Sequence, residues 1–290
     1  MLLTMMMTSV RWVVVNTTPC DINGPRFAWR EAGHGAPPLV LLHGLGGSRI
    51  SWEPQLAALA DRTRVVAWDA PGYGAAPSLP GAVTFAALAD AVVALADELG
   101  ADAFHLAGIS FGGMIAQHLA IRHPARVLSL TLLATSPKFG LDGTSPDEWR
   151  AVRLAPLDAG HEPVEFADRV LAGIAGPHIT ATARAGQRAA MARVTGDALR
   201  RSIDCLVTHD TRHLLGTIDV PTRVLVGALD EETPPDYSRQ LAALIPQAQL
   251  DVIDGAGHLL NVEASDAVNA ALAEQLAVNV VRPTVHELRS

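Results

Sequence analysis

A serine flanked by glycines is the strongest chemical signal in the sequence. Residues 108–112 read Gly-Ile-Ser-Phe-Gly, between a short apolar stretch and a pattern typical of a helix. A sharp turn from strand to helix strains the backbone of its central residue and exposes that side chain above the sheet. Ser110 is therefore the predicted nucleophile, and the N–H of Phe111 is a predicted donor to an oxyanion. The alternative is that Ser110 only caps the helix.

A serine hydroxyl needs a base to become nucleophilic, and the end of the chain supplies one. His258 follows the last predicted strand in a glycine-containing loop, and Asp230 comes shortly after the strand before it. In open α/β sheets, ligands bind at the carboxyl ends of the strands. The sequence therefore predicts His258 as the base and Asp230 as the carboxylate that orients it, with Glu231 and Glu232 as adjacent alternatives.

A glycine-rich segment at residues 43–48, His-Gly-Leu-Gly-Gly-Ser, follows an early apolar stretch. Backbone N–H groups in such a loop can approach an oxyanion closely. We assign the second oxyanion donor to the N–H of Leu45, although a plain tight turn would have the same composition. His43 precedes the serine and lacks a carboxylate in a matching position, so we expect a structural role for it.

The elements that must position these residues alternate between strand and helix. Short apolar stretches bounded by glycine or proline are typical of buried parallel strands, which implies a mostly parallel sheet with helices on both faces. We predict strands at 11–15, 26–30, 38–42, 64–68, 104–107, 127–133, 222–226 and 249–253. We predict helices at 52–61, 84–99, 114–123 and 237–244, and a last helix from about residue 264.

The alternation stops between residues 136 and 218, where helical patterns and five prolines occur without a buried strand. We interpret this segment as a helical cap inserted into an α/β core formed by residues 1–135 and 219–290. Trp149 and Arg153 of the cap are candidate substrate contacts. Together with Arg150 and His161, they could meet an acid group of a substrate or simply lie on a solvated helix face.

Five motifs together resemble the α/β-hydrolase superfamily over residues 25–278, including the order Ser, Asp, His in the chain. They are His43-Gly-Leu-Gly-Gly47, Asp69-Ala-Pro-Gly-Tyr-Gly74, Gly108-Ile-Ser-Phe-Gly-Gly113, Gly227-Ala-Leu-Asp230 and Gly257-His258. Residues 45–56, 107–117 and 257–263 look most like the 3-oxoadipate enol-lactonase group and related carboxylesterases. The resemblance implies an α/β-hydrolase fold and a serine hydrolase that cleaves a small carboxylic ester or lactone through an acyl-enzyme.

Departures from related families limit the alternatives. Haloalkane dehalogenases and epoxide hydrolases carry Asp where this chain has Ser110. The C–C hydrolases of meta-cleavage type usually have Gly-Pro-Gly after the early His-Gly and Trp after the catalytic His, whereas this chain has Gly46-Gly47-Ser48 and Leu259. C–C bond hydrolysis of a vinylogous diketone and a hydrolase-fold ligand-binding protein remain the alternative functions.

Composition narrows the class of partner. The 290 residues carry 22 Lys and Arg against 30 Asp and Glu, without a clustered basic stripe, which argues against nucleic acid. We find no signal peptide and no apolar run of the roughly 18–20 residues that a membrane-spanning helix needs. Two distant cysteines, Cys20 and Cys205, suggest free thiols and a cytoplasmic protein. No metal-ligand motif, phosphate loop or dinucleotide fingerprint occurs, so we expect no cofactor. The oligomeric state stays open.

Overall fold

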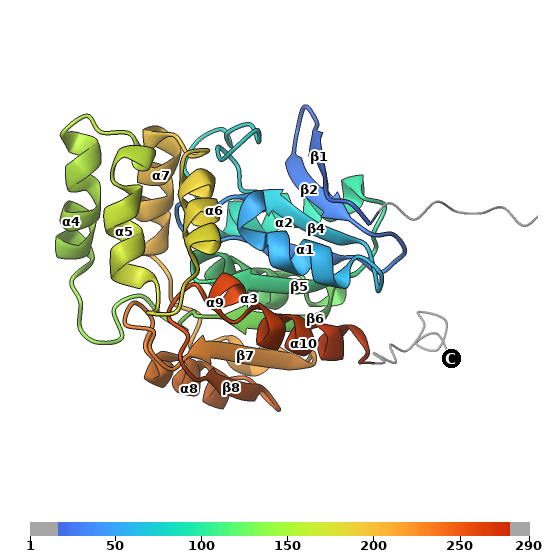
Figure 1. The fold of residues 1–290 in the computed structure, drawn as a ribbon. Coiled ribbons are helices and arrows are strands. Elements are labelled where there is room, and N and C mark those ends of the chain that lie inside the picture. The colour runs from blue at the N-terminus through green and yellow to red at the C-terminus, as the bar shows by residue number, and fades with distance from the viewer. Residues whose placement is uncertain (1–16, 279–290) are drawn as a thin grey trace, which may run out of the picture.

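The computed structural model describes residues 17–278, in which eight strands form one sheet (Figure 1). The spatial order is β1-β2-β4-β3-β5-β6-β7-β8. β1 pairs antiparallel with β2 and β2 antiparallel with β4, whereas all other pairs are parallel. The strands are β1 (Cys20–Asn23), β2 (Ala28–Ala32), β3 (Leu39–Leu42), β4 (Val65–Asp69), β5 (Phe104–Ile109), β6 (Val127–Leu133), β7 (Thr222–Gly227) and β8 (Gln249–Ile253).

The predicted fold class is confirmed, and β3 to β8 lie close to their predicted bounds. The strand predicted at 26–30 is displaced to β2, at 28–32. β1 was not predicted, because this short edge strand alternates between half-buried and exposed residues and contains no apolar run. The strand predicted at 11–15 lies outside the described residues.

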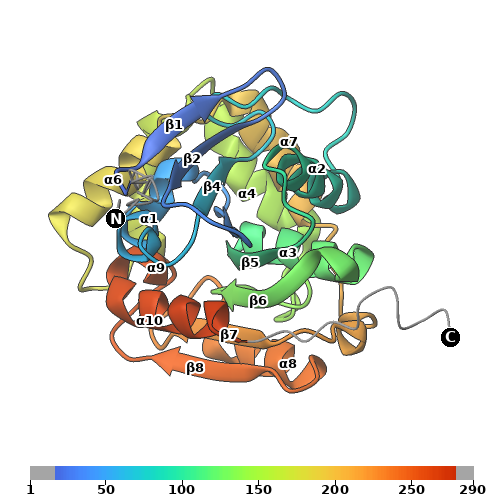
Figure 2. The ribbon, with the colours of Figure 1, turned by 90° about the vertical axis from the view of Figure 1, so that its right-hand side faces the viewer.

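Helices cover both faces of the sheet (Figure 2). The helices α2 (Phe85–Glu98), α3 (Phe111–Arg122) and α8 (Pro235–Leu244) pack on one face, and α1 (Glu53–Leu59) and α10 (Ser265–Leu276) on the other. Successive side chains of β3 therefore enter different cores. Val40 and Leu42 pack in the core under α2, α3 and α8, and Leu39 and Leu41 pack in the core under α1 and α10. None of the helices between residues 17 and 278 is long and apolar enough to span a membrane.

Four helices between β6 and β7 gather beyond one end of the sheet (Figure 1). They are α4 (Pro146–Asp158), α5 (Ala167–Ile174), α6 (Ala181–Met191) and α7 (Gly196–Leu206), which we call the cap helices. Ser145, Thr180 and Thr195 start three of them, since each hydroxyl accepts a hydrogen bond from the N–H three residues later. The expected helical insertion is thus present, while the domain limits at 136 and 218 stay a prediction.

Close backbone packing surrounds the turn between β5 and α3. A Cβ atom on Gly108 would lie 2.3 Å from the carbonyl oxygen of Gly112, and one on Gly112 would lie 2.2 Å from that of Leu42. A side chain at either glycine would therefore collide with neighbouring backbone. The turn can therefore pack directly against the end of β3.

We expect Gly112→Ala to destabilise the protein by about 1–3 kcal/mol, because backbone must move to admit the methyl group. The measurement is the midpoint of urea unfolding. Gly186→Ala is the matched control: Gly186 also lies in a helix, but its Cβ would meet nothing within 4 Å. The control should be neutral or more stable by up to about 1 kcal/mol. Equal midpoints for the two variants would contradict this account of the turn.

Candidate active site

Ser110 has a backbone conformation that side-chain-bearing residues rarely adopt, with φ 53° and ψ −118°. Three hydrogen bonds hold it: its N–H donates to Leu133 O at 2.9 Å, and its carbonyl accepts from Met114 N–H at 3.0 Å and Thr135 Oγ1 at 2.9 Å. Such conformations cost about 1–3 kcal/mol and persist where surrounding structure enforces them. Although Ser110 stands at the N-cap of α3, its hydroxyl makes no capping hydrogen bond. The alternative that Ser110 only caps the helix therefore does not account for its hydroxyl.

His258 and Asp230 are brought together at the carboxyl ends of β8 and β7. The Nδ1–H of His258 donates to Oδ2 of Asp230 at 2.9 Å, and both side chains are buried. Asp230 also accepts hydrogen bonds from the N–H groups of Glu232 and Thr233 and from the Thr233 hydroxyl, each at 2.9 Å. Glu231, one of the alternative carboxylates, is exposed. The Asp230 contact leaves Nε2 of His258 as the nitrogen that is free to take a proton.

The electrostatics of His258 favour the charged imidazolium. Burial lowers the pKa of His258, but the Asp230 charge and hydrogen bond outweigh it, and Glu232 and Glu263 add to them, so the pKa is raised above 6.5. Burial opposes a low pKa for Asp230, but His258 and Thr233 lower it below 3.8. The pair is therefore suited to stabilise a positive charge that develops on the ring during proton transfer.

The glycine-rich segment 43–48 lies against Ser110. A Cβ on Gly44 would be 3.4 Å from the Cβ of Ser110. Within residues 17–278, the N–H groups of Leu45 and Phe111 donate no hydrogen bond. His43 is buried and both its ring nitrogens are engaged, one with Gly44 O at 2.8 Å and the other with the N–H of Ala70 at 3.0 Å. Burial also lowers the pKa of His43, which fits the structural role expected for it.

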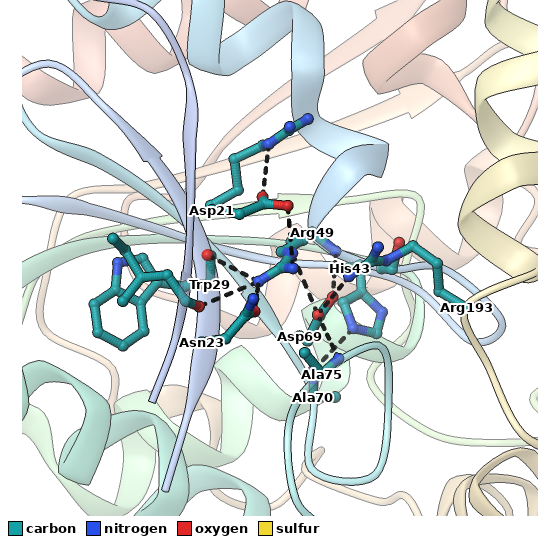
Figure 3. A network of polar contacts seen from close by, with 12 residues as sticks. Asp21, Asn23, Trp29, His43, Arg49, Asp69, Ala70, Ala75 and Arg193 are labelled. Carbon is teal, nitrogen blue, oxygen red and sulfur yellow. Dashed lines mark hydrogen bonds and ion pairs between the residues drawn. The ribbon is translucent and has the colours of Figure 1, made fainter. Parts of the chain in front are cut away.

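A buried charge network fixes the far end of this segment (Figure 3). Arg49 lies one residue beyond the segment; its N–H donates to Asp69 Oδ1 at 2.9 Å, and its guanidinium lies 3.4 Å from Asp69 Oδ2. The guanidinium also contacts Asp21, Asn23 and the carbonyl of Trp29. Arg193, from the connection between cap helices α6 and α7, donates to the same carboxylate at 3.1 Å. The network thus joins the glycine-rich segment, the hairpin of β1 and β2 at the edge of the sheet, and the cap.

Glu263, which the sequence did not single out as a functional residue, holds the loop of His258 on both sides. It ends the short helix α9 (Leu260–Glu263), and its carboxylate accepts hydrogen bonds from Gly257 N–H at 2.7 Å and Leu259 N–H at 3.1 Å. A third bond, at 3.0 Å, comes from the N–H of Gly176 in the cap connection between α5 and α6. Glu263 lies five residues after His258 in the sequence.

Ser110 and His258 line one cavity of about 110 Å³, together with Gly44 and Leu45. Apolar side chains from the cap and core form most of its wall, namely Ile109, Val170, Leu171, Ile174, Met191, Leu206 and Leu259. No hydrogen bond joins the Ser110 hydroxyl to a described residue. Catalytic hydrogen bonds are often long without substrate and shorten only in the reacting complex.

The four candidate substrate contacts of the cap divide into two pairs. Trp149 and Arg153 line the cavity. The Arg153 guanidinium lies 5.1 Å from the Trp149 ring centre and donates to both carboxylate oxygens of Glu232, at 2.6 and 2.8 Å. Arg150 instead pairs with Asp204 at 2.7 Å, and His161 is exposed beside Glu165. Neither Arg150 nor His161 lines the cavity.

The sequence of this chain matches a known family over most of the chain's length. The family model for the alpha/beta hydrolase fold matches residues 37–265. The chain belongs to the α/β-hydrolase fold family. The pimeloyl-[acyl-carrier protein] methyl ester esterase of Chromobacterium violaceum is 36% identical to this α/β hydrolase over 252 residues, covering 83% of this chain and 94% of the esterase.

Two solved structures extend the comparison. The enol-lactonase from Burkholderia xenovorans LB400 superposes with a TM-score of 0.77 and 26% identity, covering 89% of this α/β hydrolase and 100% of the enol-lactonase. A thermophilic esterase from Thermogutta terrifontis gives a TM-score of 0.77 and 26% identity, covering 89% and 98% of the two chains. The predicted resemblance is therefore confirmed for the family.

We expect the rate at which a fluorophosphonate modifies Ser110 of this α/β hydrolase to fall as pH drops through the pKa of His258, because only the neutral ring accepts the proton. The raised pKa puts this midpoint above pH 6.5. Asp230→Asn should move the midpoint to lower pH and reduce the limiting rate by up to about 10⁴-fold, since the ring loses its orienting charge. A midpoint unchanged in this variant would show that Asp230 does not act on the base.

We expect Glu263→Gln to lower the rate of the same reaction by about tenfold or more, because losing a hydrogen bond to a charged group costs about 1.5–3 kcal/mol. Removing this negative charge should also lower the pKa of His258 and move the midpoint to lower pH. The other charged groups near His258 keep their charges in this variant. They are Asp230 and Glu232, from the loop after β7, and Arg153 of α4, which is paired with Glu232.

Glu165→Gln is the matched control for Glu263→Gln. The Glu165 carboxylate also accepts a backbone hydrogen bond, from Glu162 N–H at 2.6 Å, but far from His258 in an exposed part of the cap. This control should leave both rate and midpoint unchanged. If Glu263→Gln behaves in the same way as the control, Glu263 does not position His258.

Proposed function

We propose that this protein hydrolyses a carboxylic ester or lactone of a small molecule through an acyl-enzyme on Ser110. The observation that carries this proposal is the Ser110 hydroxyl, which is free of any capping bond and shares a cavity with His258, whose Nδ1 is held by Asp230 at 2.9 Å. A serine, a carboxylate and a histidine in this chain order and in these positions form the catalytic triad of acyl transfer.

The first half of the proposed reaction transfers the acyl group to the enzyme. Nε2 of His258 takes the proton from Ser110 Oγ as this oxygen attacks the carbonyl carbon. Asp230 stabilises the resulting imidazolium and keeps the ring oriented. When the tetrahedral intermediate collapses, His258 gives its proton to the alcohol oxygen, and the carbon–oxygen bond of the ester breaks. Water then repeats these steps on the acyl-enzyme and releases the acid.

We assign the oxyanion hole to the N–H groups of Leu45 and Phe111. Both N–H groups are free of hydrogen bonds within the described residues. Gly44 brings the glycine-rich segment, which contains Leu45, against Ser110. Preorganised donors of this kind are worth about 100- to 1000-fold in rate for each one removed. The network around Arg49 and Asp69 supports the rigidity that such preorganisation needs.

The similar proteins support an ester or lactone as the bond that is cleaved, since two of them are named esterases and one an enol-lactonase. The small, mostly apolar cavity supports a small-molecule substrate. Trp149 and Arg153 are the proposed substrate contacts from the cap.

The decisive experiment combines a fluorophosphonate with a panel of substrates. We expect mass spectrometry to find one adduct, on Ser110, that is absent from Ser110→Ala. The wild type should hydrolyse p-nitrophenyl butyrate or γ-butyrolactone, and Ser110→Ala should lose at least about 10³-fold of that activity. Bleaching of a yellow dienol acid without turnover of esters or lactones would instead establish C–C hydrolysis. No adduct, together with ligand-induced thermal stabilisation, would establish a ligand-binding protein.

A further inference from the structure

A second cavity adjoins the one at Ser110. It has a volume of about 540 Å³ and is lined by residues of all four cap helices, α4 to α7. Phe166, Met191, Leu199 and Ile203 contribute buried apolar side chains to its wall. Of its charged residues, Arg153 and Glu232 are paired with each other, and Arg169 is exposed. We call this cavity the cap groove.

The cap groove is continuous in its lining with the cavity at Ser110. Leu45 and Gly46 of the glycine-rich segment line both, as do the cap residues Val170, Ile174 and Met191. The cavity at Ser110, at about 110 Å³, is much the smaller of the two. The adjoining groove provides further apolar space for a substrate that places its carbonyl at Ser110.

The ion pair between Arg153 and Glu232 stands where the two cavities meet, because both residues line both of them. Glu232 comes from the core loop after β7, and Arg153 from cap helix α4, so the pair spans from core to cap. Each side chain is about a third exposed, at 32% and 30%. Pairing neutralises both charges at the junction, and partial exposure means that the pair can separate at small cost.

We propose that the cap groove is an acyl-chain subsite, so that the preferred substrate is an ester of an apolar carboxylic acid. This inference rests on the proposed ester hydrolysis at Ser110. The acyl chain is the part assigned to the groove, because it stays attached to Ser110 through both steps until water releases it. The alcohol departs after the first step.

Gly173 offers a way to fill the groove without touching the catalytic residues. It lies in α5, lines the cap groove and not the cavity at Ser110, and a Cβ there would meet nothing within 4 Å. Gly173→Leu therefore projects a side chain into open space. Gly186→Leu is the matched control, since Gly186 is also a helical glycine with open space but lines neither cavity.

The test measures kcat/KM for p-nitrophenyl acetate, butyrate and octanoate. Burial of each methylene should raise kcat/KM by up to about fourfold in the wild type. Gly173→Leu should lower the value for octanoate by about tenfold or more and leave acetate unchanged, while Gly186→Leu should change neither. No gain with chain length, or equal loss on acetate and octanoate in Gly173→Leu, would overturn the proposal.

A second series distinguishes the two ends of the ester. Acetate esters of ethanol, butanol and octanol keep the acyl group short, so their kcat/KM should not depend on the groove. A loss confined to octyl acetate in Gly173→Leu would show that the groove takes the alcohol and would overturn the acyl assignment.

Binding to Ser110→Ala separates failure of the groove from failure of the proposed function. Methyl octanoate should raise the unfolding temperature of this variant more than methyl acetate does, and adding Gly173→Leu should abolish the difference. If the wild type shows no esterase activity, the same binding result would sustain the groove while refuting the proposed reaction. Equal stabilisation by both esters would refute the groove, whatever the activity.

Discussion

The backbone conformation of Ser110 is the constraint on which the rest of the site depends. A φ of 53° costs about 1–3 kcal/mol for a residue with a side chain, so the surroundings must enforce it. β6, Thr135 just after it, and α3 do so through hydrogen bonds to both backbone groups of Ser110. Glycines at 108 and 112 let the turn pack against the end of β3. As a result, the hydroxyl leaves the helix end and faces the cavity.

Around this turn, carboxylates hold backbone loops in place. Asp69 binds the N–H of Arg49 at the end of the glycine-rich segment, and Glu263 binds the N–H groups on either side of His258. Each of these carboxylates also contacts the cap, through Arg193 and Gly176 respectively. These contacts link the cap to the two loops that flank Ser110. Hydrogen bonds to charged groups are about twice as strong as neutral ones, which suits them to this role.

The core and the cap contribute differently to chemistry. The core supplies Ser110, His258 and Asp230 from the carboxyl ends of strands. The cap supplies most of the apolar surface over them. A partly exposed ion pair such as Arg153 with Glu232 contributes only about 1 kcal/mol. Specificity at this junction can therefore change at little cost in stability.

The sequence by itself determined the elements and the order of the reactive residues. Buried strands read as apolar runs because helices cover both faces, and glycines mark the turn at Ser110 because backbone fills the space that a Cβ would need. It did not reveal β1, an edge strand with half-exposed residues. Only the tertiary structure decided which carboxylate meets His258, and it alone paired Arg153 with Glu232, Arg193 with Asp69 and Glu263 with Gly176. These partners lie 79, 124 and 87 residues apart, so no local pattern encodes their contact, which arises only when the cap packs onto the core.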